Sequence, residues 1–281
     1  MSSLLSVSEI KALCAQYRIR PTKDRGQNFL IDERVAQETI HAANLHLDDE
    51  VIEVGPGFGA LTFGLAACAK QVTAVEIEPK LILWLREEMK RRGVKNVETV
   101  EGDAIQFISS SVHQWQDFVV IASLPYQITS DFFSALLKDD CVPRRLVLII
   151  QKEVAERLHA RPPHMSLLSV IVQWYGKVKL VREVPRSAFW PQPAVESALV
   201  RIDTQGGARL IAPLRTHCGV KIRSENFFDF IKPAFRFPRR KIANTIEIRA
   251  DSRLHPRSSA LWEKRPGELG IDDWIALFRA Q

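Results

Sequence analysis

The sequence predicts an α/β protein, with a doubly wound, mostly parallel sheet followed by a small C-terminal all-α domain. From Val51 onward, short β-branched runs alternate with helical stretches, which is typical of β-α-β units. The first run ends in a glycine turn at residues 55–59, GPGFG. A polar stretch at residues 204–207 then separates this region from one in which only helices are expected.

The elements follow in order. Ser6 and Glu9 fit a capping box that begins a helix toward Tyr17, and Asp32 is expected to cap a second helix that ends near Asn44. We predict seven strands and, between them, five helices. The strands lie near residues 51–54, 71–76, 97–100, 118–122, 146–150, 177–182 and 196–202, and the helices near 60–69, 79–92, 130–138, 151–160 and 166–175. Residues 185–193 join the last two strands without a helix, which favours an antiparallel hairpin at the sheet edge.

The linker at residues 204–207 predicts two domains, residues 1–205 and residues 206–281. Helices in the second are expected near 224–235, 238–248, 257–264 and 271–280. Its core is expected to consist of Phe227, Phe228, Phe230, Ile231, Phe235 and Phe237.

The net charge of +6 is unevenly distributed. From residue 201 onward there are 16 basic and 9 acidic residues, whereas the first 200 contain 23 and 24. This asymmetry indicates that the C-terminal part faces phosphate. Arg239, Arg240 and Lys241 stand at the start of the predicted helix 238–248, against the helix dipole, so we expect them to contact nucleic-acid phosphates. The basic loop at residues 18–25, with Arg25, is a second candidate for such contacts.

Composition excludes several classes of function. The four cysteines are far apart and the seven histidines are scattered, so neither a metal site nor a disulfide is predicted. No apolar run is long enough to span a membrane. The N-terminus lacks the charged region of a secretory signal, so a cytoplasmic protein is expected.

The glycine turn indicates a nucleoside site. Gly55 and Gly57 allow the chain to approach a ligand closely. Glu76 ends the next strand, 21 residues after Gly55, where an acidic residue reaches the hydroxyls of a ribose. Two nucleoside cofactors fit this pattern. Gly55, Gly57 and Ala60 satisfy the dinucleotide fingerprint, but an acidic turn better suits S-adenosylmethionine, which has no phosphate.

The following strand ends favour the second cofactor. Asp103 follows the third strand and is able to accept a hydrogen bond from an adenine amino group. The fourth strand runs into Ser123-Leu124-Pro125-Tyr126. A short polar side chain and a carbonyl before proline can accept both hydrogens of an adenine amine and free its lone pair for attack on a sulfonium methyl. Tyr126 is placed to stack on a base flipped out of its helix. The alternative is that this tetrapeptide only ends a strand and packs the core.

These segments resemble the KsgA family of rRNA adenine dimethyltransferases along nearly the whole chain. The matching segments are QNFL, EVGPGFGALT, AVEIEPKL, EGDA, LPYQITS, IIQKEVAERL, SLLSVIVQ, AFWPQPAVESALVRI and FRFPRRKIANTI. The resemblance implies the seven-stranded, Rossmann-like methyltransferase form of the doubly wound fold. It also implies transfer of two methyl groups to each of two adjacent adenines, in a hairpin near the 3′ end of small-subunit rRNA.

The resemblance also implies roles for residues. It implies cofactor contacts from Asn28, Leu30, Gly55, Glu76, Asp103 and Ser123, to which we add their neighbours Gly57, Ile77 and Ala104. It implies contacts with the target base from Leu124, Pro125, Tyr126 and Phe189. The expected partner is the assembling small ribosomal subunit, approached by a monomer.

One residue departs from the family pattern, because Ser123 stands where the family usually has Asn. A serine hydroxyl accepts a hydrogen bond but is shorter and also donates. We expect a functional but slower enzyme. The alternative is an rRNA-binding assembly factor with weak or no methyl transfer. The related family that methylates large-subunit rRNA also remains open, although the proline-rich stretch and the basic C-terminal segment resemble it less.

Overall fold

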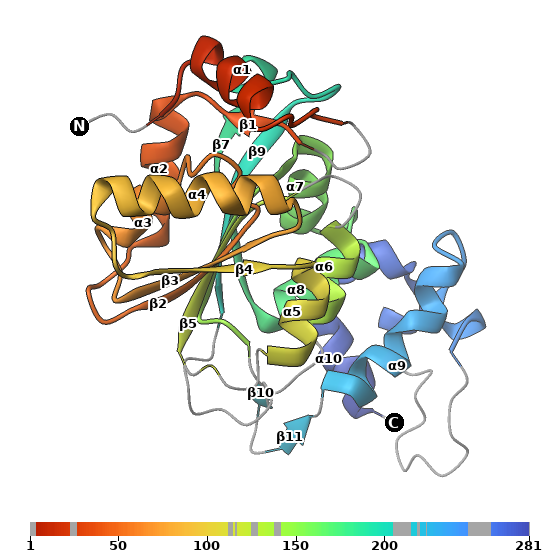
Figure 1. Ribbon diagram of the computed structural model, residues 1–281. Coiled ribbons are helices and arrows are strands. Elements are labelled where there is room, and N and C mark those ends of the chain that lie inside the picture. Colours follow the sequence, from red (N-terminus) through yellow and green to blue (C-terminus); the bar gives the residue numbers. More distant parts are fainter. Residues whose placement is uncertain are drawn as a thin grey trace. The chain divides into compact units, whose positions relative to one another are not determined.

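Figure 1 shows the computed structural model of the chain, in which helices surround a central sheet. The structure describes residues 4–22, 27–111, 115, 117–124, 129–137, 142–204, 215–217, 220–222, 224–246 and 260–280. It contains two compact units. The first comprises Met1–Ala155 and Lys179–Arg209, and the second comprises Glu156–Val178 and Leu210–Gln281. Residues 156–178, which the sequence-based boundary assigns to the first domain, therefore group with the C-terminal residues.

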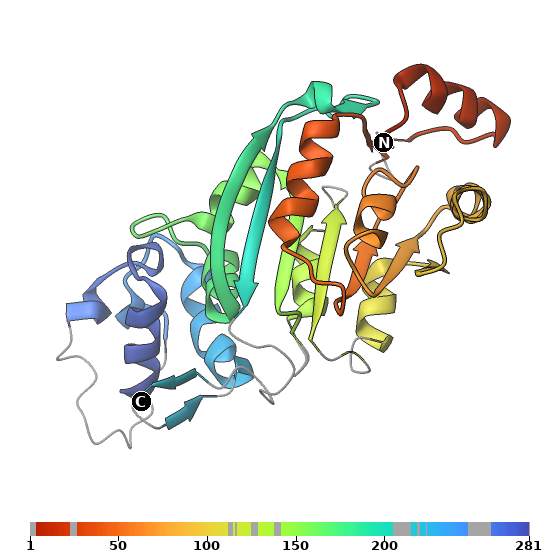
Figure 2. The ribbon, with the colours of Figure 1, turned by 90° about the vertical axis from the view of Figure 1, so that its left-hand side faces the viewer.

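The main sheet has seven strands, as predicted, in the order β4-β3-β2-β5-β6-β9-β7. Strands β2 to β6 are parallel to one another, and β9 is antiparallel to β6. Figure 2 shows β7 and β9 side by side as long strands, which confirms the predicted edge. The seven strands are β2 (Glu50–Val54), β3 (Gln71–Glu76), β4 (Val97–Glu101), β5 (Phe118–Ser123), β6 (Arg145–Gln151), β7 (Gly176–Val184) and β9 (Ser197–Thr204).

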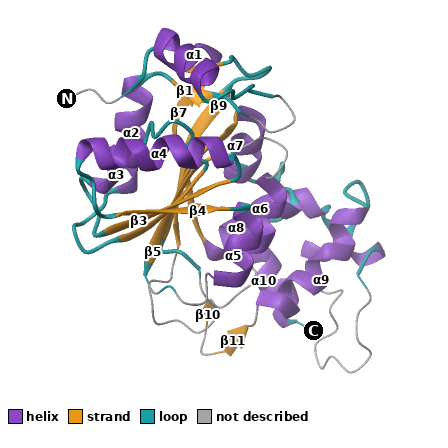
Figure 3. Cartoon of the chain, in the orientation of Figure 1, coloured by secondary structure: helices purple, strands orange, loops and turns teal. Residues whose placement is uncertain are grey.

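The central strands are buried on both faces. Every residue of β5 from Val119 to Ala122 is fully buried, so the strand reads as a continuous apolar run, as in sheets with helices on both sides. Figure 3 shows these strands surrounded by helices, with α2, α3 and α4 over one face and α5 and α6 over the other (Figure 1). The helices are α1 (Val7–Gln16), α2 (Glu33–Ala43), α3 (Thr62–Ala66), α4 (Pro79–Arg92), α5 (Ala104–Ser111), α6 (Thr129–Leu136), α7 (Lys152–His159) and α8 (Leu167–Tyr175).

The capping predictions are confirmed. The Ser6 side chain accepts from the Glu9 amide while the Glu9 carboxylate accepts from the Ser6 amide. Asp32 accepts from the amides of Arg34 and Val35, at 2.9 and 3.2 Å. Each bond satisfies a donor that the first helical turn leaves without an intrahelical partner.

A short pairing was not predicted from the sequence. Strand β1 (Phe29–Leu30) pairs antiparallel with β8 (Phe189–Trp190), with Phe29 opposite Trp190 and Leu30 opposite Phe189. A short 3-10 helix, η3 (Arg186–Ala188), precedes β8. Two-residue strands contain too few residues to show an alternating pattern. The pairing joins the QNFL and FWPQP segments, which are about 160 positions apart in sequence.

The second unit is mainly helical, with a two-stranded sheet of β10 (Arg215–His217) and β11 (Val220–Ile222). Its other elements in the described residues are the last residues of α7, then α8 (Leu167–Tyr175), α9 (Ser224–Arg236), α10 (Ile271–Arg279) and the 3-10 helices η4 (Ile242–Asn244), η6 (Ala260–Glu263) and η7 (Pro266–Glu268). Phe227 stacks on Trp174 with ring centroids 4.3 Å apart, and Phe230 meets Trp274 edge to face. The prediction for Phe237 was wrong, since its side chain is 48% exposed.

The predicted helix at 238–248 is also wrong. Helix α9 ends at Arg236, residues 237–240 form a turn, and of the described residues up to Ile246 only Ile242–Asn244 are helical, as a 3-10 turn. Pro238 explains the break, because the residue before a proline is disfavoured in helical conformation. The basic residues therefore follow the C-terminus of a helix, where cations are favourable. The prediction that these cations oppose a helix dipole is therefore wrong.

Candidate functional site

A cavity of about 260 Å³ lies in the first unit, at the carboxyl ends of β2, β3, β4 and β5. This is the end of a doubly wound sheet at which ligands bind. All nine residues that we predicted to bind a cofactor line it, although they come from five separate stretches of the chain. They are Asn28, Leu30, Gly55, Gly57, Glu76, Ile77, Asp103, Ala104 and Ser123.

The glycine turn forms one wall of the cavity and requires glycine. Gly55 and Gly57 have φ angles of 71° and 56°, in the left-handed region that other residues rarely adopt. A Cβ atom on Gly57 would lie 3.1 Å from the Phe29 ring. The turn therefore presents bare backbone to the cavity.

Glu76 is held in place by the backbone. Its Oε2 accepts a hydrogen bond from the Gly57 amide at 3.2 Å, and its Oε1 accepts one from the Glu78 amide at 3.0 Å. The side chain is 6% exposed, and this burial raises its pKa. Each carboxylate oxygen can accept more than one hydrogen bond. The oxygens can therefore also accept from the hydroxyls of a ribose.

Glu53 is a second buried carboxyl group on the cavity wall. It is 1% exposed, and its Oε2 has no hydrogen-bond partner within the described part of the chain. Burial raises the pKa of Glu53 to about 8, and the nearby Glu76 carboxylate acts in the same direction. Two carboxyl groups disfavour an anionic pyrophosphate and suit a ligand with positive charge. The residues present thus fit S-adenosylmethionine, which carries a sulfonium and an ammonium group.

Asp103 has a structural role besides the predicted one. Its Oδ1 accepts from the amides of Ile105 and Gln106 at 2.8 and 3.0 Å, so it caps α5. Helix α5 was not predicted from the sequence. The cap fixes the carboxyl group at the cavity wall and leaves Oδ2 without a hydrogen bond from the described residues, so this oxygen is available to a ligand.

Ser123 is the last residue of β5 and lies opposite Ile149 of β6. The Leu124 amide donates to the Ile149 carbonyl at 3.1 Å, and Leu124 is 3% exposed. The sheet thus fixes the chain up to the start of the predicted catalytic segment. Pro125 and Tyr126 lie outside the described residues.

Phe189 is brought next to the cavity but does not line it. Its partner in the β1–β8 pair is Leu30, which does line it. The Phe189 side chain is only 3% exposed. A contact of this ring with a target base stays a prediction.

None of the four predicted RNA-binding residues is among the described residues that line the cavity. Arg25 lies outside the described residues, and the other three belong to the second unit. The Arg240 guanidinium lies 4.7 Å from the Phe237 ring centroid, and Lys241 Nζ is 2.7 Å from Glu263 Oε2. Arg239 is exposed. Phosphate contacts by these side chains stay predictions.

Sequence reasoning missed the N-terminal wall of the cavity. Leu4 and Leu5 line it, together with Ile10 of α1. Ile10 is 1% exposed. The capping box of α1 was visible in the sequence, but the surface that the helix covers was not. Phe29, Phe58 and Leu61 complete the apolar part of the wall.

Among the residues that the structure describes, no group of histidine, cysteine and acidic side chains could hold a metal ion. Cys14 is buried, Cys68 is partly buried, and both are free thiols. No helix in the described ranges is long and apolar enough to cross a membrane.

Comparisons with known proteins agree with this geometry. A family model described as ribosomal RNA adenine dimethylase matches residues 20–248. A ribosomal RNA small subunit methyltransferase A of Clostridium perfringens is 35% identical over 267 residues, 93% of this chain and 87% of that protein. One from Clostridium botulinum is 34% identical over 241 residues, 84% and 83% of the two chains.

Solved structures show the same fold. A dimethyladenosine transferase from Plasmodium falciparum matches with a TM-score of 0.73 at 24% identity, covering 89% of this chain and 95% of that one. The 23S rRNA methyltransferase ErmE matches with a TM-score of 0.71 at 25% identity, covering 90% and 99%. The chain has the seven-stranded, Rossmann-like sheet of these methyltransferases and belongs to the ribosomal RNA adenine dimethylase family.

Proposed function

We propose that the protein dimethylates the N6 amino groups of two adjacent adenines, in a hairpin near the 3′ end of small-subunit rRNA, with S-adenosylmethionine as methyl donor. The observation that carries this proposal is the single cavity lined by all nine predicted cofactor residues at the carboxyl ends of the parallel strands. The family match supports methylation of rRNA adenine. The relatives named as small-subunit enzymes support the choice of substrate.

The predicted cofactor residues, together with Glu53, have proposed roles in the cavity. Glu76 binds the ribose hydroxyls, since both of its oxygens are fixed by backbone amides. Asp103 accepts from the adenine amino group of the cofactor with the oxygen that does not cap α5. Glu53, which keeps its proton in the free protein, ionises when the positively charged cofactor binds beside it and then balances that charge. Gly55 and Gly57 let the backbone lie against it, while Asn28, Leu30, Ile77 and Ala104 complete the wall.

The bound cofactor supplies an electrophilic methyl group. The Ser123 hydroxyl and the Leu124 carbonyl accept the two hydrogens of the target amine and orient its lone pair toward the cavity. Pro125 keeps that carbonyl in place, and Tyr126 and Phe189 hold the extruded base. Neither a metal ion nor a strong base is required, because the amine loses its proton after attack, so positioning carries most of the catalysis.

Partners follow from the substrate. We propose that the protein acts as a monomer on the assembling small subunit in the cytoplasm, with Arg25, Arg239, Arg240 and Lys241 contacting rRNA phosphates. The alternative of an assembly factor without methyl transfer is not favoured by the family match.

Mass spectrometry tests the proposal. The protein is incubated with the 3′ hairpin of small-subunit rRNA and methyl-labelled cofactor, and the RNA is digested to nucleosides. We expect N6,N6-dimethyladenosine at two adjacent positions. Retention of the RNA without label would support the assembly-factor alternative. A large-subunit rRNA hairpin is tested in parallel, and label on that RNA alone would assign the protein to the family that methylates large-subunit rRNA.

A further inference from the structure

A second hollow in the first unit lies outside the cofactor cavity. This basic groove has a volume of about 460 Å³ and is formed by α1, the segment after it and the end of β8. Its lining residues are Lys11, Cys14, Ala15, Arg18, Ile19, Arg20, Pro21 and Trp190. The proposed mechanism uses none of them.

Among the described residues that line the basic groove, every charged side chain is positive. Lys11, Arg18 and Arg20 are exposed, and no acidic side chain is among the lining residues. The acidic residue of α1, Glu9, is bound to the Ser6 amide and hydroxyl at the other end of the helix, at 2.7 and 2.6 Å. Three cations around one hollow attract a polyanion.

Trp190 adds an aromatic face. Its side chain is partly exposed, and Lys11 Nζ lies over the ring, 5.8 Å from its centroid, so one face of the ring is turned toward Lys11, which also lines the groove. Pairing of Trp190 with Phe29 fixes its backbone. An aromatic ring among cations is the arrangement that binds single-stranded nucleic acid, by stacking on a base while the cations contact phosphates.

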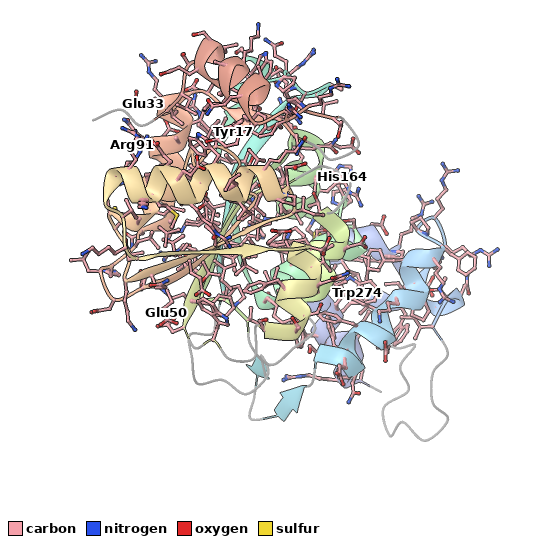
Figure 4. The ribbon with its side chains drawn as sticks, viewed as in Figure 1. Tyr17, Glu33, Glu50, Arg91, His164 and Trp274 are labelled. Atoms are coloured by element: carbon pink, nitrogen blue, oxygen red, sulfur yellow. The ribbon has the colours of Figure 1, made fainter. Side chains whose placement is uncertain are left out.

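The groove is built on an anchored segment. Ile10, Cys14 and Ile19 are buried. The Tyr17 hydroxyl donates to Glu87 of α4, and Lys80 Nζ donates to the Arg18 carbonyl at 2.7 Å. Figure 4 shows Tyr17 between α1 and α4. The cationic side chains thus project from a fixed backbone.

The groove adjoins the cofactor cavity through two elements. In α1, Ile10 lines the cavity and Lys11 lines the groove. In the β1–β8 pair, Phe29 lines the cavity and its partner Trp190 lines the groove. RNA bound in the groove would therefore contact residues that are adjacent to, or paired with, residues of the cofactor cavity.

We propose that the basic groove binds a single-stranded stretch of the rRNA that flanks the target adenines, with one base stacked on Trp190 and phosphates on Lys11, Arg18 and Arg20. This inference rests on the proposed function, which makes rRNA the substrate. The groove supplies affinity and holds the strand beside the cavity, while cations of this kind carry no sequence information.

The test measures RNA affinity by fluorescence anisotropy over a series of salt concentrations. The probe is the 3′ hairpin of small-subunit rRNA with its single-stranded flanks. Lys11→Ala and Arg20→Ala are expected to weaken binding and each to lower the slope of log K against log salt by about 0.7, the value for one phosphate contact to a single strand. Trp190→Ala is expected to weaken binding about tenfold with an unchanged slope, as loss of one stacked base does, and Trp190→Phe should retain most of the affinity.

Lys95→Ala is the matched control, an exposed lysine in the turn after α4, and it should leave the affinity unchanged. Calorimetry with S-adenosylhomocysteine shows for every variant that the cofactor cavity is intact. If the groove variants keep the RNA affinity and the salt slope, while the wild-type protein methylates the hairpin, the proposed function is not affected and RNA binding by the groove is refuted. Unchanged RNA affinity with weakened binding to protein-containing subunit particles would also overturn it, because the groove would then serve a protein. If the wild-type protein does not methylate the hairpin, the proposed function is refuted, and the affinity measurements still show whether the groove binds RNA.

Discussion

Replacement of Glu53 by glutamine should change how the stability of the protein depends on pH. Glu53 is 1% exposed, and burial raises its pKa from 4.5 to about 8. Glutamine has the same shape but no charge to bury, so the substitution conserves volume. The variant isolates the free energy of ionising this one buried carboxyl group.

The sign follows from proton binding. In the unfolded chain the group ionises near pH 4.5, whereas in the folded protein it keeps its proton up to about pH 8. Between these values the folded state binds one proton more than the unfolded state, so stability falls as pH rises. The stabilising contribution of the protonated Glu53 is therefore fully present below about pH 4.5 and is lost by about pH 8. At about 1.4 kcal/mol for each pH unit, the loss between pH 5 and pH 8 is about 4 kcal/mol.

The assay is urea denaturation of wild type and Glu53→Gln at several pH values from 5 to 8. As pH rises from 5 to 8, we expect the free energy of unfolding of the wild type to fall by about 4 kcal/mol relative to that of the variant. Glu76, whose pKa is also raised, is present in both proteins, so the two profiles differ through Glu53 and through its repulsion with Glu76. Glu98→Gln, at an exposed position of β4, is the control and should follow the wild type. Parallel pH profiles for wild type and Glu53→Gln would refute the reasoning.

Three further predictions concern the site and the RNA contacts. Ser123→Asn should raise the rate of methylation of the hairpin and Ser123→Ala should lower it by about 10²-fold, as loss of one positioned hydrogen-bonding group does. An unchanged rate in either variant would contradict the acceptor role of Ser123. Gly57→Ala should lower the free energy of unfolding by about 1–2 kcal/mol, because the φ of Gly57 is 56°. It should also weaken the binding of S-adenosylhomocysteine measured by calorimetry, since the added Cβ would lie 3.1 Å from Phe29. Unchanged stability and unchanged binding would show that the turn tolerates a side chain. The double variant Arg239→Glu/Arg240→Glu should weaken RNA binding at low salt without changing binding of S-adenosylhomocysteine, whereas equal RNA affinity would remove these residues from the interface.

The elements of the main sheet were predictable because their signals are local. The strands are β-branched runs with distinct ends, and α4 begins with Pro79 and ends at Gly93, which has a φ of 69°. A proline in the first turn and a glycine after the last are strong signals of helix ends. The cavity residues were predictable because parallel strands present their carboxyl ends at one edge, whatever their order in the sequence.

The elements that sequence reasoning missed depend on contacts between distant segments. The β1–β8 pair has two residues in each strand, so no alternation is visible, and only the fold brings the two together. Helix α5 is short, with three serines at its end, and its cap Asp103 had been assigned to a ligand. Serines favour helix ends and turns over helix interiors. Pro238 was interpreted as a helix start, although the residue before it is restricted to extended conformations.

The N-terminal segment illustrates what the sequence leaves open. The capping box of α1 was visible, and so was the basic character of the residues that follow. Neither pattern indicates which surface the helix covers. In the structure Ile10 closes the cofactor cavity, and Lys11 opens onto the basic groove. Adjacent residues of one helix therefore belong to two different sites.

A crystal structure with S-adenosylhomocysteine would test the central assignment most directly. We predict the ligand in the cavity between the glycine turn and α1, with its ribose on Glu76, its adenine on Asp103 and its sulfur directed toward Ser123. A ligand bound elsewhere, or bound with its sulfur directed away from Ser123, would contradict the account.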